Sequence, residues 1–131
     1  MQQRVSKKEQ GRLKVFFHGV QGRINARTKR FEQRWGLPIR SRGRVSYSDL
    51  MEKYFKYEGK CAYCEAKLAI MQRRYGKTVK RLTFDHVLSL HNGGRTEIEN
   101  LVPSCQFCNQ DKGEKEYNPQ AVVTVGEEVS E

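Results

Sequence analysis

Two pairs of cysteines are the clearest potential metal ligands in this sequence. Cys61 and Cys64 form one C-x-x-C pair, and Cys105 and Cys108 form the other. This spacing lets one tight turn present two thiolates to an ion, and four thiolates satisfy a tetrahedral Zn²⁺. Disulfides are disfavoured because nothing in the sequence points to an oxidising compartment. A thioredoxin-like redox motif would explain one pair but not two. The cysteines therefore predict a structural zinc site that stabilises a small polar chain.

A second group of polar residues lies between the cysteine pairs and directly after the last cysteine. Asp85 and His86 are adjacent, Asn100 precedes a short apolar run, and Asn109 follows the second pair. The string DHV-x5-GG-x5-NLVPSCQFCNQDKG resembles the HNH endonuclease family in its four-cysteine, zinc-stabilised form. The resemblance covers residues 59–113. It implies a ββα-metal fold, in which two short strands, a long loop and one helix hold a divalent ion.

The resemblance also implies a role for each of these residues. His86 would be the general base that activates water, and Asp85 and Asn109 would hold a catalytic divalent ion. Oxygen ligands of this kind suit Mg²⁺ or Mn²⁺. Asn100 would bridge the loop and act through geometry. The structural alternatives are a core histidine at 86, a strand-end or His86-orienting carboxylate at 85, and a helix-terminus hydrogen bond at 109.

Phosphodiester hydrolysis sets requirements that these residue types can meet. The reaction needs a water made nucleophilic, an electrophilic metal on the phosphate and stabilisation of the leaving 3′ oxygen. Histidine is the natural base at neutral pH. Adjacent residues of a regular strand point to opposite faces. For Asp85 and His86 to share a site, we expect the strand to end or bulge there.

The apolar pattern predicts an α+β fold that could position these residues. Apolar residues recur at helical spacing over residues 5–35, although three glycines leave open two helices or one interrupted helix. A helix capped by Ser46 or Ser48 should lead to the first cysteine pair. Further along, we expect a strand over 79–90, a short strand over 100–103 and a helix over about 105–116.

The positive charge is concentrated in the N-terminal third. The 131-residue chain carries a net charge of +10, and residues 1–45 hold 13 Lys and Arg against two acids. This asymmetry is typical of a nucleic-acid-binding surface, against the simpler reading of a solvated basic face. The candidate nucleic-acid contacts are Arg23, Arg27, Lys29, Arg30, Arg34, Arg40, Arg42, Arg44 and Lys112.

These patterns together predict a small metal-dependent nuclease acting on DNA, most simply on duplex DNA. We expect a basic helical DNA-binding extension over residues 1–45, the nuclease domain over 46–117 and an acidic tail over 118–131. No apolar run or signal peptide points to a membrane or to secretion, so we expect a cytoplasmic protein. Its small format is similar to that of phage or mobile-element HNH proteins, which would act in the host cytoplasm. Two other functions fit the same residues: a non-catalytic zinc module that binds nucleic acid, and an RNA-directed nuclease.

Overall fold

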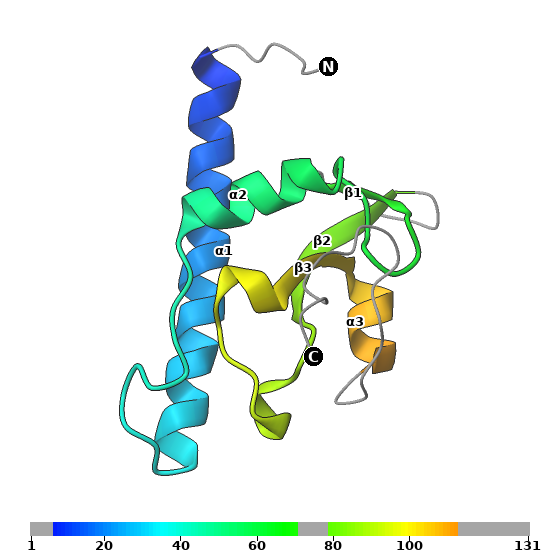
Figure 1. Ribbon diagram of the computed structural model, residues 1–131. Helices are drawn as coiled ribbons and strands as arrows, with labels where there is room; N and C mark the ends of the chain where they lie inside the picture. Colours follow the sequence, from blue (N-terminus) through cyan, green and yellow to red (C-terminus); the bar gives the residue numbers. More distant parts are fainter. Residues whose placement is uncertain (1–6, 71–78, 113–131) are drawn as a thin grey trace.

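The computed structural model describes residues 7–70 and 79–112 (Figure 1). The elements in this part are α1 (Lys7–Arg34), α2 (Tyr47–Lys56), β1 (Lys67–Ala69), β2 (Val79–His86), the 3₁₀ turns η1 (Leu90–Asn92) and η2 (Ile98–Asn100), β3 (Leu101–Cys105) and α3 (Gln106–Lys112). This mixture of helices and a sheet confirms the predicted α+β class. Among the described residues, no helix is long and apolar enough to cross a membrane.

The first helix, α1, is continuous although it contains three glycines. A glycine inside a helix costs about 1 kcal/mol relative to alanine. However, Phe17, Val20 and Ile24 recur at helical spacing and are all buried. Burial of this apolar face outweighs the glycine penalty, and it decides between the two possibilities that the sequence left open.

Local hydrogen bonds end α1 and begin α2. Gly36 has a φ of +66°, and the Leu37 N–H bonds to the Glu32 carbonyl at 2.8 Å, which is the Schellman arrangement. At the start of α2, the Ser46 hydroxyl accepts from the Asp49 N–H at 3.3 Å. Ser46 is therefore the N-cap, one of the two serines predicted for that position.

A three-stranded sheet lies at the centre of the second half of the chain. The strand order is β1-β2-β3, with β1 parallel and β3 antiparallel to β2. In the antiparallel pair, Leu82 lies opposite Cys105 and His86 lies opposite Leu101. Because α3 follows β3 directly, the succession β2-β3-α3 is the ββα arrangement that the resemblance implied.

The element boundaries differ in part from the predicted ones. The strand predicted over 79–90 is too long, since β2 ends at His86 and the Val87 N–H bonds to the Asn100 carbonyl. The strand predicted over 100–103 extends to the second cysteine pair. The short strand β1 was not predicted, because three residues carry no usable pattern. The end of the helix predicted over 105–116 lies outside the described residues.

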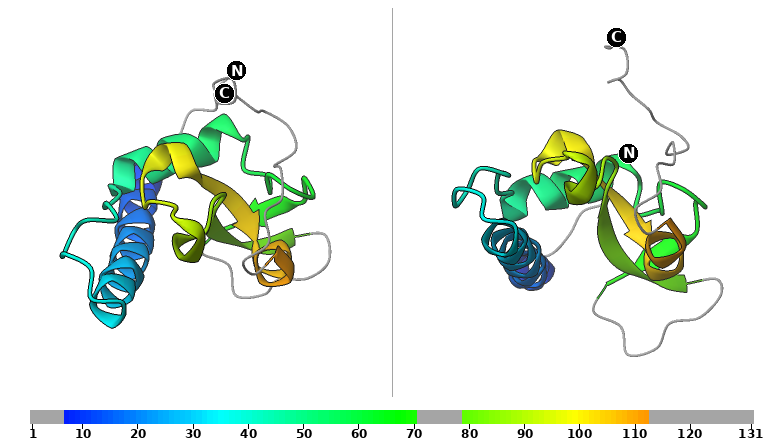
Figure 2. Two further views of the ribbon diagram at one scale, coloured as in Figure 1. Left: turned by 60° about the horizontal axis from the view of Figure 1, so that its bottom comes forward. Right: turned by 90° about the horizontal axis from the view of Figure 1, so that it is seen from below.

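One hydrophobic core joins α1 to the sheet. Its largest members from α1, α2, β1, β2 and β3 are Phe17, Ile24, Leu50, Leu68, Leu82, Phe84 and Leu101. In both views of Figure 2, α1 lies against α2 on one side of the molecule, and α3 lies on the other side of the sheet. The described part of the predicted extension, residues 7–45, thus shares one core with the predicted nuclease domain and does not form a separate arm.

Candidate active site

The four cysteines come together at the junction of β3, α3 and the turn that follows α2. Their sulfur atoms all lie within 4.8 Å of one another, and the Cys64 and Cys105 sulfurs are 3.9 Å apart. A tetrahedral zinc with Zn–S bonds of about 2.3 Å needs sulfurs about 3.8 Å apart. The geometry and the all-sulfur ligand set both fit a structural zinc ion.

The electrostatics of the cluster also favour a cation. Burial, together with neighbouring cysteines, raises the pKa of the Cys64 and Cys108 thiols. At Cys61, burial opposes ionisation, but backbone N–H groups of Cys64, Cys105 and Tyr63 donate to its sulfur and bring its pKa below the ordinary value. Four neighbouring thiolates repel one another, and a divalent ion among them removes that repulsion.

Tyr63 connects this cysteine cluster to Asp85. The tyrosine belongs to the first C-x-x-C turn, and its hydroxyl donates to Asp85 Oδ2 at 2.5 Å. Burial raises the pKa of Tyr63 far above its ordinary value, and the bond to the Asp85 carboxylate raises it further. The tyrosine is therefore a neutral donor, and it holds one oxygen of the carboxylate in place.

Asp85, His86 and Asn109 line one cleft of about 210 Å³. Asp85 and His86 are the last two residues of β2, and Asn109 lies on α3. The cleft is also lined by Arg27 of α1 and His91 of η1. Asp85 is buried, whereas His86 and Asn109 are partly exposed. An imidazole, a carboxylate and a carboxamide thus meet beside a guanidinium, a combination that offers a proton acceptor, oxygen ligands for a cation and a positive charge.

Hydrogen bonds determine which end of the Asn109 amide faces β2. Its nitrogen donates to Thr83 Oγ1 at 3.1 Å and to the Phe84 carbonyl at 3.4 Å. A carbonyl only accepts, and the single Thr83 proton is already donated to the Ser104 carbonyl at 2.8 Å. Both neighbours therefore require the amide nitrogen on this side. The amide oxygen is the atom left to coordinate a hard cation.

The loop between β2 and β3 is held by Asn100 and by a close backbone approach. The Asn100 amide donates to the carbonyls of Leu88 and Arg95, both at 2.9 Å, and its oxygen accepts from the Leu88 N–H at 2.8 Å. A Cβ on Gly94 would lie 1.8 Å from the Leu88 carbonyl oxygen. Of the two loop glycines, only Gly93 has a positive φ, of +97°, so Gly94 is needed for space and not for its backbone angles.

Four of the predicted nucleic-acid contacts form a row along α1. Arg23, Arg27, Arg30 and Arg34 are spaced by four, three and four residues, which places them on one face of the helix. Arg23 and Arg27 line a groove of about 550 Å³ together with Arg81 of β2. Arg27 lines both this groove and the cleft. We call these four residues the arginine row.

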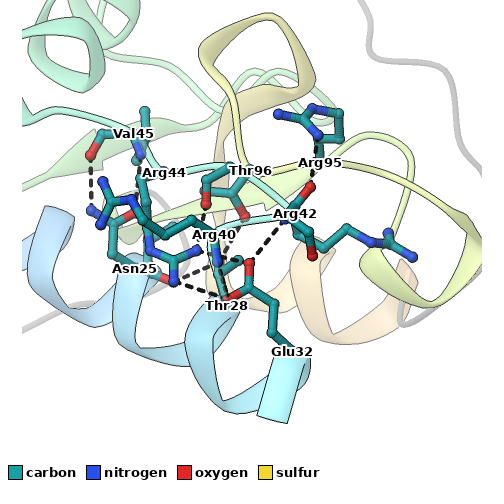
Figure 3. Close-up of polar contacts among 12 residues, drawn as sticks. Asn25, Thr28, Glu32, Arg40, Arg42, Arg44, Val45, Arg95 and Thr96 are labelled. Carbon is teal, nitrogen blue, oxygen red and sulfur yellow. Dashed lines mark hydrogen bonds and ion pairs between the residues drawn. The ribbon is translucent and has the colours of Figure 1, made fainter. Parts of the chain in front are cut away.

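Two other predicted contacts are instead engaged within the protein (Figure 3). The Arg44 guanidinium donates to both carboxylate oxygens of buried Glu32, at 2.9 and 3.0 Å. Arg42 Nη1 donates to the carbonyls of Leu90 and Gly94, at 3.2 and 2.8 Å. These guanidiniums hold the segment after α1 against the helix and against the β2–β3 loop.

The remaining predicted contacts lie elsewhere. Lys29 is exposed but falls outside the arginine row, and Arg40 is exposed in the turn after α1. The Arg40 N–H donates to Glu32 Oε1 at 2.9 Å. The side chain of Lys112 lies outside the described residues.

Sequence reasoning missed several residues at this site. Five residues that contact or flank the predicted ones were not predicted: Tyr63, Thr28, Thr96, Glu32 and Arg81. Two of them carried a signal: Tyr63 lies inside a C-x-x-C pair, and Glu32 is one of two acids in a basic segment. The threonines and Arg81 have no local pattern, because their contacts join distant parts of the chain.

Comparison with known proteins identifies the class to which this arrangement belongs. Residues 61–115 match the family model described as HNH endonuclease, so this part of the chain is an HNH domain, as the resemblance indicated. The matched segment contains the four cysteines, β2, the loop, β3 and α3. It supports a nuclease or nucleic-acid-related function. No curated protein and no solved structure matches the chain.

Proposed function

We propose that this protein is a metal-dependent endonuclease that hydrolyses phosphodiester bonds of DNA. The observation that carries the proposal is the single cleft lined by Asp85, His86 and Asn109. The match of residues 61–115 to the HNH endonuclease family supports it. Arg27 on the wall of the same cleft supplies a positive charge where a scissile phosphate would bind.

Each residue of the cleft has a distinct role in this proposal. His86 accepts a proton from the attacking water as general base. The carboxylate of Asp85 and the amide oxygen of Asn109 hold a divalent ion, Mg²⁺ or Mn²⁺, whose ligand preference they match. When bound, such an ion polarises the phosphate and stabilises the negative charge on the leaving oxygen. A zinc ion held by the four cysteines would have a structural role.

The arginine row provides a path for the nucleic acid toward the cleft. It is exposed, and Arg27 belongs to both the groove and the cleft. Arginines on one helix face bind phosphates without reading bases, so we propose duplex DNA without assigning a target sequence. We also propose that the protein acts in the cytoplasm, because four cysteines free of disulfides suit a reducing compartment.

Nicking of a supercoiled plasmid tests this function. We expect cleavage with Mg²⁺ or Mn²⁺, no cleavage after chelation, and a loss of about a hundredfold or more in rate for His86→Ala. The matched control is His18→Ala, since His18 is an exposed residue of α1 that stacks on Tyr47. That variant should nick like the wild type. Zinc content is measured in every sample, so that chelation of the structural ion is recognised.

Three results would decide against parts of the proposal. Equal nicking by His86→Ala and the wild type would exclude His86 as the base. Tight DNA binding with no nicking under any metal would favour a non-catalytic zinc module. Faster cleavage of an RNA than of a DNA of matched sequence would make the protein an RNA-directed nuclease.

A further inference from the structure

A buried pair of threonine hydroxyls connects α1 to His86. Thr28 on α1 and Thr96 in the β2–β3 loop are both 0% exposed, and their hydroxyl oxygens are 2.7 Å apart (Figure 3). Thr28 also donates to the carbonyl of Ile24 at 2.9 Å. On the other side, Thr96 Oγ1 lies 2.9 Å from Nε2 of His86. Three hydrogen bonds thus run in series from the helix backbone to the imidazole.

Only one set of directions makes all three hydrogen bonds of this series. A hydroxyl has one proton, and a carbonyl oxygen can only accept. The Thr28 proton is donated to Ile24, so Thr28 must accept the Thr96 proton. With its own proton committed, Thr96 can only accept from His86, and Nε2 must carry a hydrogen.

The opposite direction would make one hydrogen bond fewer in this buried series. If Thr96 donated to His86, two hydroxyl oxygens would face each other at 2.7 Å with no proton between them, unless Thr28 released the Ile24 carbonyl. Because both threonines are fully buried, water cannot replace the missing bond. A buried polar contact left unmade is destabilising.

We infer that Thr28 and Thr96 are positioning residues that hold His86 in the tautomer protonated at Nε2. Nδ1 is then the nitrogen with a lone pair, and it is the atom that accepts the proton of the attacking water. This inference rests on the proposed function, in which His86 is the general base. Besides carrying the arginine row, α1 then helps to set the tautomer of His86, because the Ile24 carbonyl of this helix takes the Thr28 proton.

The surroundings of Thr96 hold the series in place. The Thr96 N–H bonds to the Arg42 carbonyl at 2.6 Å, and a Cβ on Gly43 would lie 2.5 Å from the Thr96 carbonyl oxygen. Arg95 donates to the Ser41 carbonyl at 2.8 Å. The segment after α1 therefore holds Thr96 and its neighbour Arg95 by hydrogen bonds (Figure 3). These contacts keep the Thr96 hydroxyl between Thr28 and His86.

The experiment compares Thr28→Val, Thr28→Ser, Thr96→Val and Thr96→Ser in the full-length, zinc-loaded protein. The nitrogen chemical shifts of His86 report its tautomer at about pH 8.5, well above the ordinary imidazole pKa of about 6.5. The chain has three histidines, so His86→Ala assigns the signals. We expect Nε2 to carry the proton in the wild type and in both serine variants.

The two valine variants should behave differently from each other. Thr28→Val releases the Thr96 proton, which then turns to Nε2, and the proton of the imidazole should move to Nδ1. Thr96→Val should leave a mixture of tautomers. In both valine variants, kcat for plasmid nicking should fall about tenfold to a hundredfold with KM unchanged, and the matching serine variant should restore it.

The inference is overturned if the wild-type imidazole carries its proton on Nδ1. It is also overturned if Thr28→Val leaves the chemical shifts and kcat unchanged in a protein whose circular dichroism and zinc content match the wild type. In that case His86→Ala can still abolish nicking, so the proposed function would stand alone. Undiminished nicking by His86→Ala would instead refute the proposed function, and with it the catalytic meaning of this tautomer.

Discussion

Asp85 and His86 reach the same cleft because β2 ends with them. Neighbouring residues inside a strand point to opposite faces. His86, paired with Leu101, is the last residue of the β2–β3 ladder, and the chain turns away directly after it. The two side chains are then oriented by different parts of the molecule, Asp85 by Tyr63 and His86 by Thr96. Substituting a residue that is hydrogen-bonded to Asp85 or His86 therefore tests the proposed mechanism as directly as substituting Asp85 or His86.

Replacing Tyr63 by phenylalanine should lower the nicking rate without removing the zinc. The change deletes only the hydroxyl that donates to Asp85 Oδ2, so the carboxylate is less well oriented. Loss of such an orienting partner typically reduces metal affinity or activity about tenfold to a hundredfold. The measurement is the nicking rate over a series of Mg²⁺ concentrations, together with the zinc content of the protein.

The matched control for this prediction is Tyr47→Phe. Tyr47 lies at the start of α2, away from the cleft, where its ring stacks on His18. We expect this variant to keep the wild-type rate. A zinc-loaded Tyr63→Phe protein with an undiminished rate at every Mg²⁺ concentration would show that the orientation of Asp85 does not limit the reaction.

At the scale of elements, α1 has two faces with different tasks. Phe17, Val20 and Ile24 pack into the common core, and the arginine row lies along the side of this buried stripe. Because the buried face fixes the rotation of the helix, it also fixes where the arginines point. The arginines of the N-terminal third therefore form one continuous surface in a fixed orientation only when α1 packs into the core.

Charge-neutralising substitutions in the arginine row should reduce the salt dependence of DNA binding. The logarithm of the DNA association constant falls linearly with the logarithm of the salt concentration, and each arginine that neutralises a phosphate makes this slope steeper by about 0.9. We expect the double variant Arg23→Gln, Arg30→Gln to make the slope shallower by about 2. Fluorescence anisotropy of a labelled duplex, with His86→Ala in the background to prevent cleavage, measures it.

Lys29→Gln is the internal control for this measurement. Lys29 belongs to the same helix and is exposed, but it falls outside the row. It should leave the slope nearly unchanged. Equal slopes for Lys29→Gln and the double variant would mean that DNA does not follow the arginine row.

At the scale of the whole molecule, one buried carboxylate fastens α1 to the segment that follows it. Glu32 accepts from Nη1 and Nη2 of Arg44 and from the backbone N–H groups of Arg40 and Arg42. The bond from Arg44 is the main cause that lowers the pKa of Glu32 to about 2, against the opposing effect of burial. In turn, the bond from Glu32 raises the pKa of Arg44.

Glu32→Gln should lower the free energy of unfolding by about 3 kcal/mol at neutral pH, because it removes the charged partner of a buried ion pair. A carboxylate whose pKa falls from 4.5 to about 2 on folding stabilises the protein fully above pH 4.5. That contribution is lost as the pH falls toward 2, because the folded state then binds the proton as well. The difference between wild type and variant should therefore narrow from pH 4.5 to about 2. Urea unfolding at several pH values measures it.

The quantity to compare is the difference in unfolding free energy between the wild type and Glu32→Gln at each pH. Acid also protonates the cysteine ligands, but this happens in both proteins and cancels in the comparison. Glu97→Gln removes an exposed carboxylate that pairs with Arg95 and should change stability little. A Glu32→Gln effect that stays constant down to pH 2 would contradict the proposed ionisation of Glu32.

Local patterns explain which parts of the fold could be predicted. The C-x-x-C spacing and the Ser46 cap act within a few residues, so the sequence shows them directly. The end of β2 could not be located within residues 79–90, because the bonds that stop it come from Asn100 on the far side of the loop. The joining of α1 to the core depends on a buried face whose partners lie on other elements.

The sequence by itself determined three features: the ligand chemistry of the cysteines, the presence of an acid–imidazole pair and the excess of positive charge. Residue type and short spacing are enough to establish them. Only the tertiary structure decided which groups restrain the candidate base and its neighbour. Thr28 and Thr96 are 68 positions apart, and Tyr63 and Asp85 are 22 apart. Contacts over such separations arise when packing brings the elements together, since hydrogen bonds depend on distance in space and not on distance along the chain.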